Sequence, residues 1–114
     1  MNLFEYQGKR LYQDFSIPTP KSIFVSSISE ITDNHGLTYP VVVKAQVQVG
    51  GRGKAGGIKV AKDFDELTKF SDEILGMDIK GHIVQSLLLE EASDILEEYY
   101  ISFTLDRSAK SYLM

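Results

Sequence analysis

The stretch Val41–Ala61 reads VVVKAQVQVGGRGKAGGIKVA and decides how the rest of the chain can be arranged. Its first part, Val41–Val47, is rich in β-branched residues, and its last part, Ile58–Ala61, alternates apolar and polar side chains. Both patterns are typical of β-strands. Between them, Gly50–Gly57 contains five of the protein's nine glycines and no apolar side chain larger than that of alanine. The stretch therefore predicts a strand, a glycine-rich flap and a second strand.

The composition of the flap is typical of an anion-binding loop. Glycines let main-chain N–H groups approach a ligand closely, and Arg52 and Lys54 add two cations. The spacing Gly51-x-Gly53-x-x-Gly56 matches the dinucleotide-binding fingerprint, but that fingerprint requires a helix where this chain has a strand. The P-loop pattern also fails, because Lys54 is not followed by a hydroxyl residue. The remaining interpretation is a hairpin whose glycine-rich tip folds over phosphates. The alternative is a bare, flexible hairpin tip.

Lys44 interrupts the valine run of the first strand, where an unpaired lysine is costly to bury. Alternation along a strand places it on the face of Val42 and Gln46, opposite the face of Val43. A lysine on the strand that enters a glycine flap can neutralise the α- and β-phosphates of a nucleotide. The alternative is a structural salt bridge.

Charge is distributed unevenly. The protein carries a net charge of −4, yet the window 40–62 contains five cations and none of the 16 acidic residues. A general polyanion binder would spread positive charge over a broad face. The pattern instead predicts a focused site for a small anion, with a chance solvated strip as the alternative.

Length and composition exclude several classes of protein. A chain of 114 residues with 43% hydrophobic and 25% charged residues is typical of one globular domain, here residues 1–114. No apolar run is long enough for a membrane span, and the absence of cysteine excludes disulfides and thiolate metal sites. His35 and His82 each lack a neighbouring second ligand, which favours structural roles.

The remaining periodicities predict an α+β fold in which helices pack on a mixed or antiparallel sheet. Helices are expected at Leu3–Phe15, opened by a capping box of Asn2 and Glu5, from Ser27 to about Gly36, and from Asp63 to Gly76. Further strands are expected at Ser22–Val25, Ile83–Glu91, Tyr99–Leu105 and Ser111–Met114. Because the last strand would end partway through a hairpin, we expect the chain to be part of a longer protein.

A second candidate cluster follows the strand Ile83–Glu91. Glu90, Ser93 and Glu98 lie around a break between two strands, where free backbone groups can bind an adenine edge and a carboxylate can bind ribose hydroxyls. A solvated acidic turn is the alternative.

Three segments in order resemble the succinyl-CoA synthetase β-subunit family, which is similar to ATP-grasp proteins. They are MNLFEYQGK at 1–9, VVKAQV at 42–47 together with GGRGKAGGIKV at 50–60, and LEEASDI at 89–95 with Asp106-Arg107-Ser108. The resemblance implies a partial ATP-grasp fold with nucleotide between two α+β subdomains. It also implies roles for seven residues: Lys44 at the phosphates, Gly51, Arg52 and Gly53 in the covering flap, Glu90 and Ser93 at adenine, and Glu98 at ribose.

Two positions depart from the family pattern. Ser93 stands where the family usually has threonine, which keeps a hydroxyl, and Glu91 stands where a small residue is common. The second difference leaves the detailed adenine contacts open.

The family's reaction joins succinate and coenzyme A using ATP and Mg²⁺, through a phosphohistidine on a partner α subunit. The resemblance places the metal ligands beyond Met114 and implies a cytoplasmic enzyme, or a mitochondrial matrix enzyme in a eukaryote, whose present segment is inactive alone. The resemblance leaves open whether the nucleotide is ATP or GTP, and a malate–CoA ligase is the alternative enzyme. A third hypothesis, an RNA- or protein-binding module using the Arg52–Lys54 loop, is disfavoured because Val47–Ala61 has no aromatic residue for base stacking. We expect no nucleic-acid or membrane partner.

Overall fold

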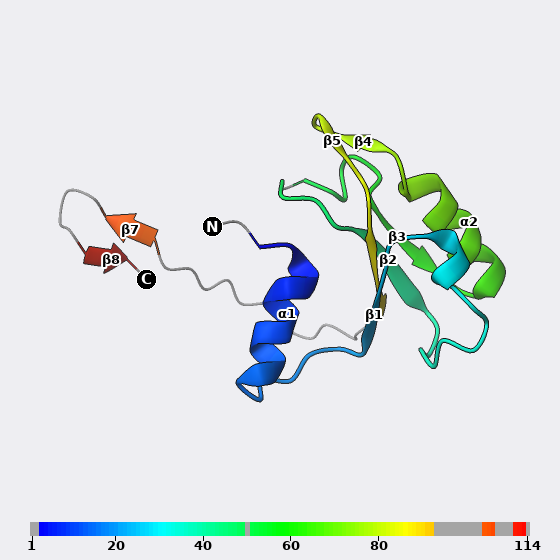
Figure 1. Ribbon diagram of the computed structural model, residues 1–114, viewed down its shortest axis with the longest axis horizontal. Helices are drawn as coiled ribbons and strands as arrows, with labels where there is room; N and C mark the ends of the chain where they lie inside the picture. Colours follow the sequence, from blue (N-terminus) through cyan, green and yellow to red (C-terminus); the bar gives the residue numbers. More distant parts are fainter. Residues whose placement is uncertain (1–2, 50, 93–103, 107–110, 114) are drawn as a thin grey trace.

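The computed structural model describes residues 3–49, 51–92, 104–106 and 111–113. Its central element is an antiparallel sheet with the strand order β1-β6-β2-β3. The four strands are β1 (Ser22–Val25), β6 (Leu87–Glu91), β2 (Val41–Ala45) and β3 (Ile58–Ala61). Helix α1 (Glu5–Asp14) lies on one face of this sheet, and helix α2 (Phe64–Ile74) covers the other (Figure 1). The α+β class expected from the sequence is confirmed.

The strand–flap–strand prediction is confirmed by the pairing of β2 with β3. Their antiparallel register runs from Val41 opposite Ala61 to Lys44 opposite Ile58. Strand β2 ends at Ala45 rather than at the predicted Val47. Beyond Ala45, the Gln46 N–H still donates to the Ser86 carbonyl in the register of β2 with β6, and the Gln46 side chain accepts from the Tyr6 N–H of α1.

The hydrophobic core lies between the sheet and α2. Val41, Val43 and Ala45 are all 0% exposed, whereas Val42 and Lys44 are half-buried on the other face, so the predicted alternation is correct. Asp63 caps α2 by accepting a hydrogen bond of 2.8 Å from the Glu66 N–H, as its sequence pattern predicts. The core is completed by apolar side chains from α2, β1, β6 and the connecting segments: Val25, Ile31, Leu37, Leu67, Ile74, Ile79, Val84, Leu87 and Leu89.

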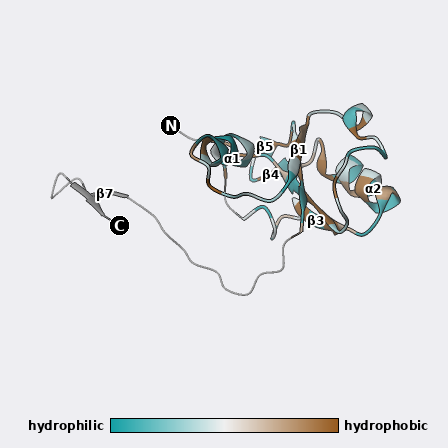
Figure 2. Cartoon of the chain, turned by 90° about the horizontal axis from the view of Figure 1, so that it is seen from below, coloured by the Kyte–Doolittle hydropathy of each residue, from teal (hydrophilic) through white to brown (hydrophobic). Residues whose placement is uncertain are grey.

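Helix α1 differs from the prediction in its start. Its N-cap is Phe4, whose N–H donates to the Gln7 side chain over 2.9 Å, so the predicted cap at Asn2 is wrong. None of its residues is buried, and Leu11 and Phe15, apolar residues at helical spacing in the sequence, are 47% and 78% exposed. Figure 2 shows α1 and α2 on opposite sides of the sheet. Tyr6 makes the main ring contact of α1 instead, 4.1 Å between centroids from Phe24 of β1.

Two further segments correct the expected boundaries. The helix predicted from Ser27 to Gly36 is a single 3₁₀ turn, η1 (Ile28–Glu30), which ends where the backbone becomes extended at Ile31, with φ −90° and ψ 112°. The strand predicted from Ile83 is divided, and β6 begins at Leu87.

A short hairpin of β4 (Asp78–Ile79) and β5 (His82–Ile83) precedes β6 and was not predicted. Its two central residues, Lys80 and Gly81, have φ values of 52° and 85°, which a tight two-residue hairpin turn requires.

Near the chain end, β7 (Thr104–Asp106) pairs with β8 (Ser111–Leu113), which confirms a hairpin there; residues 99–103 of the predicted strand lie outside the described residues. Over the described ranges, no helix is both long enough and apolar enough to cross a membrane.

Candidate functional site

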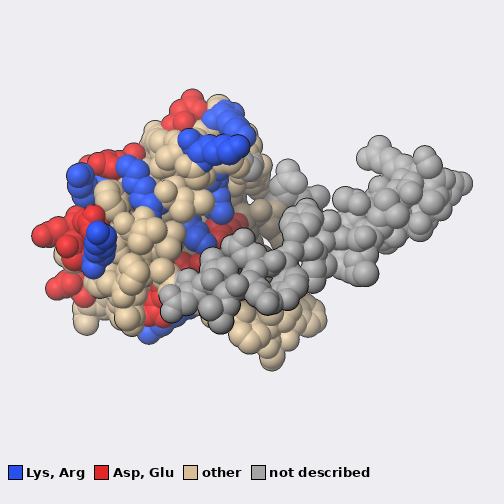
Figure 3. Space-filling view, turned by 180° about the vertical axis from the view of Figure 1, so that it is seen from behind, with Lys and Arg blue, Asp and Glu red and all other residues tan. Residues whose placement is uncertain are grey.

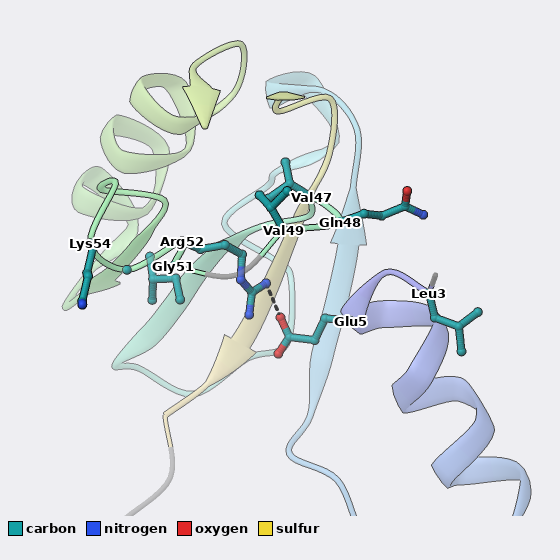
Figure 4. Close-up of a pocket in the computed structure, with 10 residues that line it drawn as sticks. Leu3, Glu5, Val47, Gln48, Val49, Gly51, Arg52 and Lys54 are labelled. Atoms are coloured by element: carbon teal, nitrogen blue, oxygen red, sulfur yellow. Dashed lines mark hydrogen bonds and ion pairs between the residues drawn. The ribbon is translucent and has the colours of Figure 1, made fainter. Parts of the chain in front are cut away.

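Cations from β2 and from the flap meet at one carboxylate of α1. Lys44 Nζ lies 3.0 Å from Glu5 Oε1, and Arg52 Nη1 lies 2.7 Å from Glu5 Oε2 (Figure 4). Arg52 also donates a 2.9 Å hydrogen bond to the Ala45 carbonyl at the end of β2. The lysine amine and the flap guanidinium are therefore on the same side of the sheet.

The cluster extends along the α1 face to Glu90 and Lys9. Glu90 lies directly across the ladder from Val42, and its Oε1 is 2.9 Å from Lys44 Nζ. Its other oxygen contacts the Lys9 ammonium, which is also 3.5 Å from Glu5. Both charged partners of Lys44 are thus carboxylates, as the salt-bridge interpretation expects, and the cluster holds three cations with two carboxylates.

These pairs shift the ionisation of Glu5 and Lys9. Burial acts to raise the pKa of Glu5, but the Arg52 hydrogen bond and the charges of Lys44 and Arg52 outweigh it and lower the pKa to about 2. Burial lowers the pKa of Lys9, and the neighbouring Lys44 charge acts in the same direction. Glu5 is accordingly fully ionised at neutral pH.

A cavity of about 810 Å³ opens beside this cluster, within the size range of small-molecule sites. The flap residues Gly51, Arg52, Gly53 and Lys54 line it together with Glu5, as Figure 4 shows. The cavity therefore combines cationic side chains with an exposed glycine backbone.

The flap backbone is tightly folded at its base and open at its tip. At the base, the Gly57 N–H donates to the Arg52 carbonyl over 2.7 Å, and a Cβ at Gly57 would lie 2.6 Å from Ile79 Cδ1. At the tip, the N–H groups of Gly53 and Lys54 make no hydrogen bond within the part of the chain that the structure describes. A Cβ at Gly53 would meet nothing within 4 Å. The tip can therefore offer main-chain donors to an anion.

On the face opposite that of Figure 1, positive charge is not gathered into a broad patch. Figure 3 shows Lys and Arg side chains interspersed with Asp and Glu over the uncovered part of the face opposite that of Figure 1. This distribution fits a focused site for a small anion better than a nucleic-acid surface.

The four residues predicted for the phosphate side come together: Lys44, Gly51, Arg52 and Gly53 all lie at or beside the cavity. Glu90, which was predicted for the adenine side, forms an ion pair with Lys44. The other two predicted site residues, Ser93 and Glu98, lie outside the described residues.

Sequence reasoning missed Glu5 and Lys9 as neighbours of the site, and it placed Gln46 on the face of Lys44 without giving it a role. Gln46 is 3% exposed, and its Oε1 accepts a 3.0 Å hydrogen bond from the Tyr6 N–H. The acid-free window 40–62 was the available signal, because its cations need carboxylates from elsewhere in the chain.

The described residues contain no group of three His, Cys, Asp or Glu side chains that could hold a metal ion. His35 has a structural role: one ring nitrogen accepts from the Leu37 N–H and the other is 2.9 Å from the Tyr39 hydroxyl.

Comparisons with known proteins agree with this geometry. The chain matches a solved structure of D-alanine–D-alanine ligase from Helicobacter pylori with a TM-score of 0.61 and 16% identity. The match covers 96% of this chain and 34% of that ligase, so it establishes a shared fold over about a third of the larger protein. The family model described as the ATP-grasp domain matches residues 2–114. The chain therefore belongs to the ATP-grasp domain family.

Proposed function

We propose that the chain forms the phosphate-binding side of a nucleotide site in an ATP-dependent acid–CoA ligase, with succinate as the acid. One observation carries the nucleotide assignment: Lys44 and Arg52, from a strand and from the flap, come within hydrogen-bond distance of the same carboxylate. Two cations that converge on one oxyanion are also placed to converge on a phosphate group.

Each part of the site has a distinct task in this proposal. Lys44 would neutralise the α- and β-phosphates from the sheet, and the Gly53 and Lys54 amides would donate to phosphate oxygens from above. Arg52 would close the flap onto the same phosphates. Bound ATP supplies the phosphoryl group that activates the acid. The described residues contain no carboxylate set for Mg²⁺. From the resemblance to the succinyl-CoA synthetase β-subunit family, the metal ligands would come from residues after Met114.

The acid, coenzyme A and the partner subunit are assigned from sequence resemblance. The segments at 1–9, 42–60 and 89–95 support the succinyl-CoA synthetase β-subunit family, and hence a partner α subunit that carries a phosphohistidine. A malate–CoA ligase would begin in a similar way, and GTP could replace ATP. A cytoplasmic or mitochondrial matrix location follows from the same resemblance. Assaying the full-length protein with its α subunit on succinate and on malate, with ATP and with GTP, separates these cases.

The test of nucleotide binding compares two lysines on opposite faces of the sheet. In the full-length protein, Lys44→Ala should weaken ATP binding by about 10- to 100-fold, since a hydrogen bond to a charged group contributes about 1.5–3 kcal/mol. Lys59→Ala is the matched control, because Lys59 pairs with Glu73 of α2 on the far face, 2.6 Å away. Isothermal titration calorimetry measures the ATP affinity of both variants.

The folding of each variant is checked by thermal unfolding, because Lys44→Ala leaves Glu90 with Lys9 as its remaining cation. A folded Lys44→Ala protein with unchanged ATP affinity would refute the assignment. Equal losses in the two variants would show a general charge effect rather than a site.

A further inference from the structure

Glu5 holds the phosphate-site cations in an arrangement that a phosphate group would reproduce. Its two oxygens divide between Lys44, at 3.0 Å, and Arg52, at 2.7 Å. The Gln46 amide adds a weaker donor, 3.4 Å from Oε2. A negatively charged oxygen pair bridging two cations from the sheet and the flap is the contact that the proposed function assigns to nucleotide phosphate.

The two carboxylates of the cluster differ in how firmly they are held. Glu90 is 6% exposed and lies on β6, which is paired on one side with β1 and on the other with β2. Glu5 lies on the first turn of α1, is 21% exposed at its side chain and lines the cavity. Of the two, Glu5 is the one that an incoming anion reaches and can displace.

Helix α1 is attached to the sheet by few contacts. None of its residues is buried. Besides the ion pairs of Glu5 and Lys9, its attachments in the described part of the chain include the Tyr6 ring on Phe24 and the hydrogen bonds of Tyr6 N–H and Glu5 with the Gln46 side chain. An element with so few buried apolar contacts opens at low free-energy cost.

A phosphate and the Glu5 carboxylate cannot use the same donors together. Two anions on one pair of cations repel each other, and the Lys44 and Arg52 N–H groups that point at Glu5 are open to phosphate only once Glu5 leaves. We propose that Glu5 is a built-in substitute for phosphate, which nucleotide phosphates displace from Lys44 and Arg52 and whose release loosens α1. This inference rests on the proposed nucleotide site and adds a competing group to it.

The first test is the nucleotide affinity of Glu5→Gln in the full-length protein. Removing the competing charge should tighten ATP binding by about tenfold, which corresponds to about 1.4 kcal/mol. Glu73→Gln is the matched control: it removes the same charge from α2 on the far face and should leave the affinity unchanged. Weaker binding by Glu5→Gln would overturn the inference and make Glu5 a group that positions the two cations.

The second test uses the wild-type protein, so it does not depend on the folding of a variant. Hydrogen exchange of the α1 amides is followed with and without inorganic tripolyphosphate or ATP. Displacement of Glu5 predicts faster exchange in α1 when either ligand is bound. Unchanged or slower exchange with bound ligand would refute it.

The two proposals fail in different ways. If neither ATP nor tripolyphosphate binds the wild-type protein, the nucleotide site itself is wrong. If Lys44→Ala weakens ATP binding while Glu5→Gln does not tighten it, the site stands and the displacement is wrong.

Discussion

Replacing Glu5 by Gln should make the stability of the protein less dependent on pH, apart from any effect on ligand binding. The substitution keeps the shape of the side chain and removes the charge that Lys44 and Arg52 share. Because both cations lower the Glu5 pKa in the folded protein, the ionised carboxylate stabilises the folded state. The variant loses that contribution at neutral pH.

The size of the contribution follows from the pKa. A fall from 4.5 to about 2 corresponds to about 3.4 kcal/mol as an upper bound, at roughly 1.36 kcal/mol for each pH unit. The Glu5 side chain is 21% exposed, and solvent weakens such pairs. We therefore expect Glu5→Gln to lower the free energy of unfolding by about 1–2 kcal/mol at pH 7.

The sign of the Glu5 pKa shift determines how the stabilisation by Glu5 changes with pH. A carboxylate whose folded pKa lies below its unfolded pKa stabilises the protein above the unfolded value, here 4.5, and loses that effect as the pH falls toward 2. Urea unfolding of wild type and Glu5→Gln between pH 7 and pH 2.5 measures the difference. The two proteins should converge below pH 4.5. A difference that stays constant over this range, or that is absent at pH 7, would refute the electrostatic explanation.

Two further substitutions test the helix cap and the glycine packing in the elements around the site. Asp63→Ala removes the side-chain cap of α2 and should lower the free energy of unfolding by about 1 kcal/mol in urea, whereas an unchanged value would show that the cap is dispensable. Gly57→Ala places a Cβ 2.6 Å from Ile79 Cδ1 and should cost about 1–3 kcal/mol. Gly53→Ala, with nothing within 4 Å, is its control, and equal losses in the two would contradict the packing argument.

The hairpin and α2 could be predicted because their signals are local. The alternation of Val41–Ala45 and the glycines that follow fix a strand and a flap without reference to the rest of the chain. Asp63 and the apolar spacing after it define α2 in the same way. The face on which Lys44 lies also follows from strand alternation alone.

The position of α1 could not be predicted because long-range contacts determine it. The helical spacing of Phe4, Leu11 and Phe15 predicts the helix but not its packing, because Leu11 and Phe15 are largely exposed. What attaches the helix is a set of charges separated by about forty residues in sequence, such as Glu5 with Lys44. The β4–β5 hairpin was missed for a different reason: each strand has two residues, too few for an alternation pattern.

The cations of the acid-free window 40–62 depend on carboxylates from the rest of the chain. Each of its ion-paired cations draws its carboxylate from another element: Lys44 from α1 and β6, Arg52 from α1, and Lys59 from α2. Partly buried cations need such partners, because an unpaired buried charge is strongly destabilising. A ligand therefore meets cations that are already paired with carboxylates, and its affinity depends on what it displaces as well as on what it binds. The same pairs that stabilise the folded protein should oppose phosphate binding, which is why Glu5→Gln is expected to lower stability and to raise affinity together.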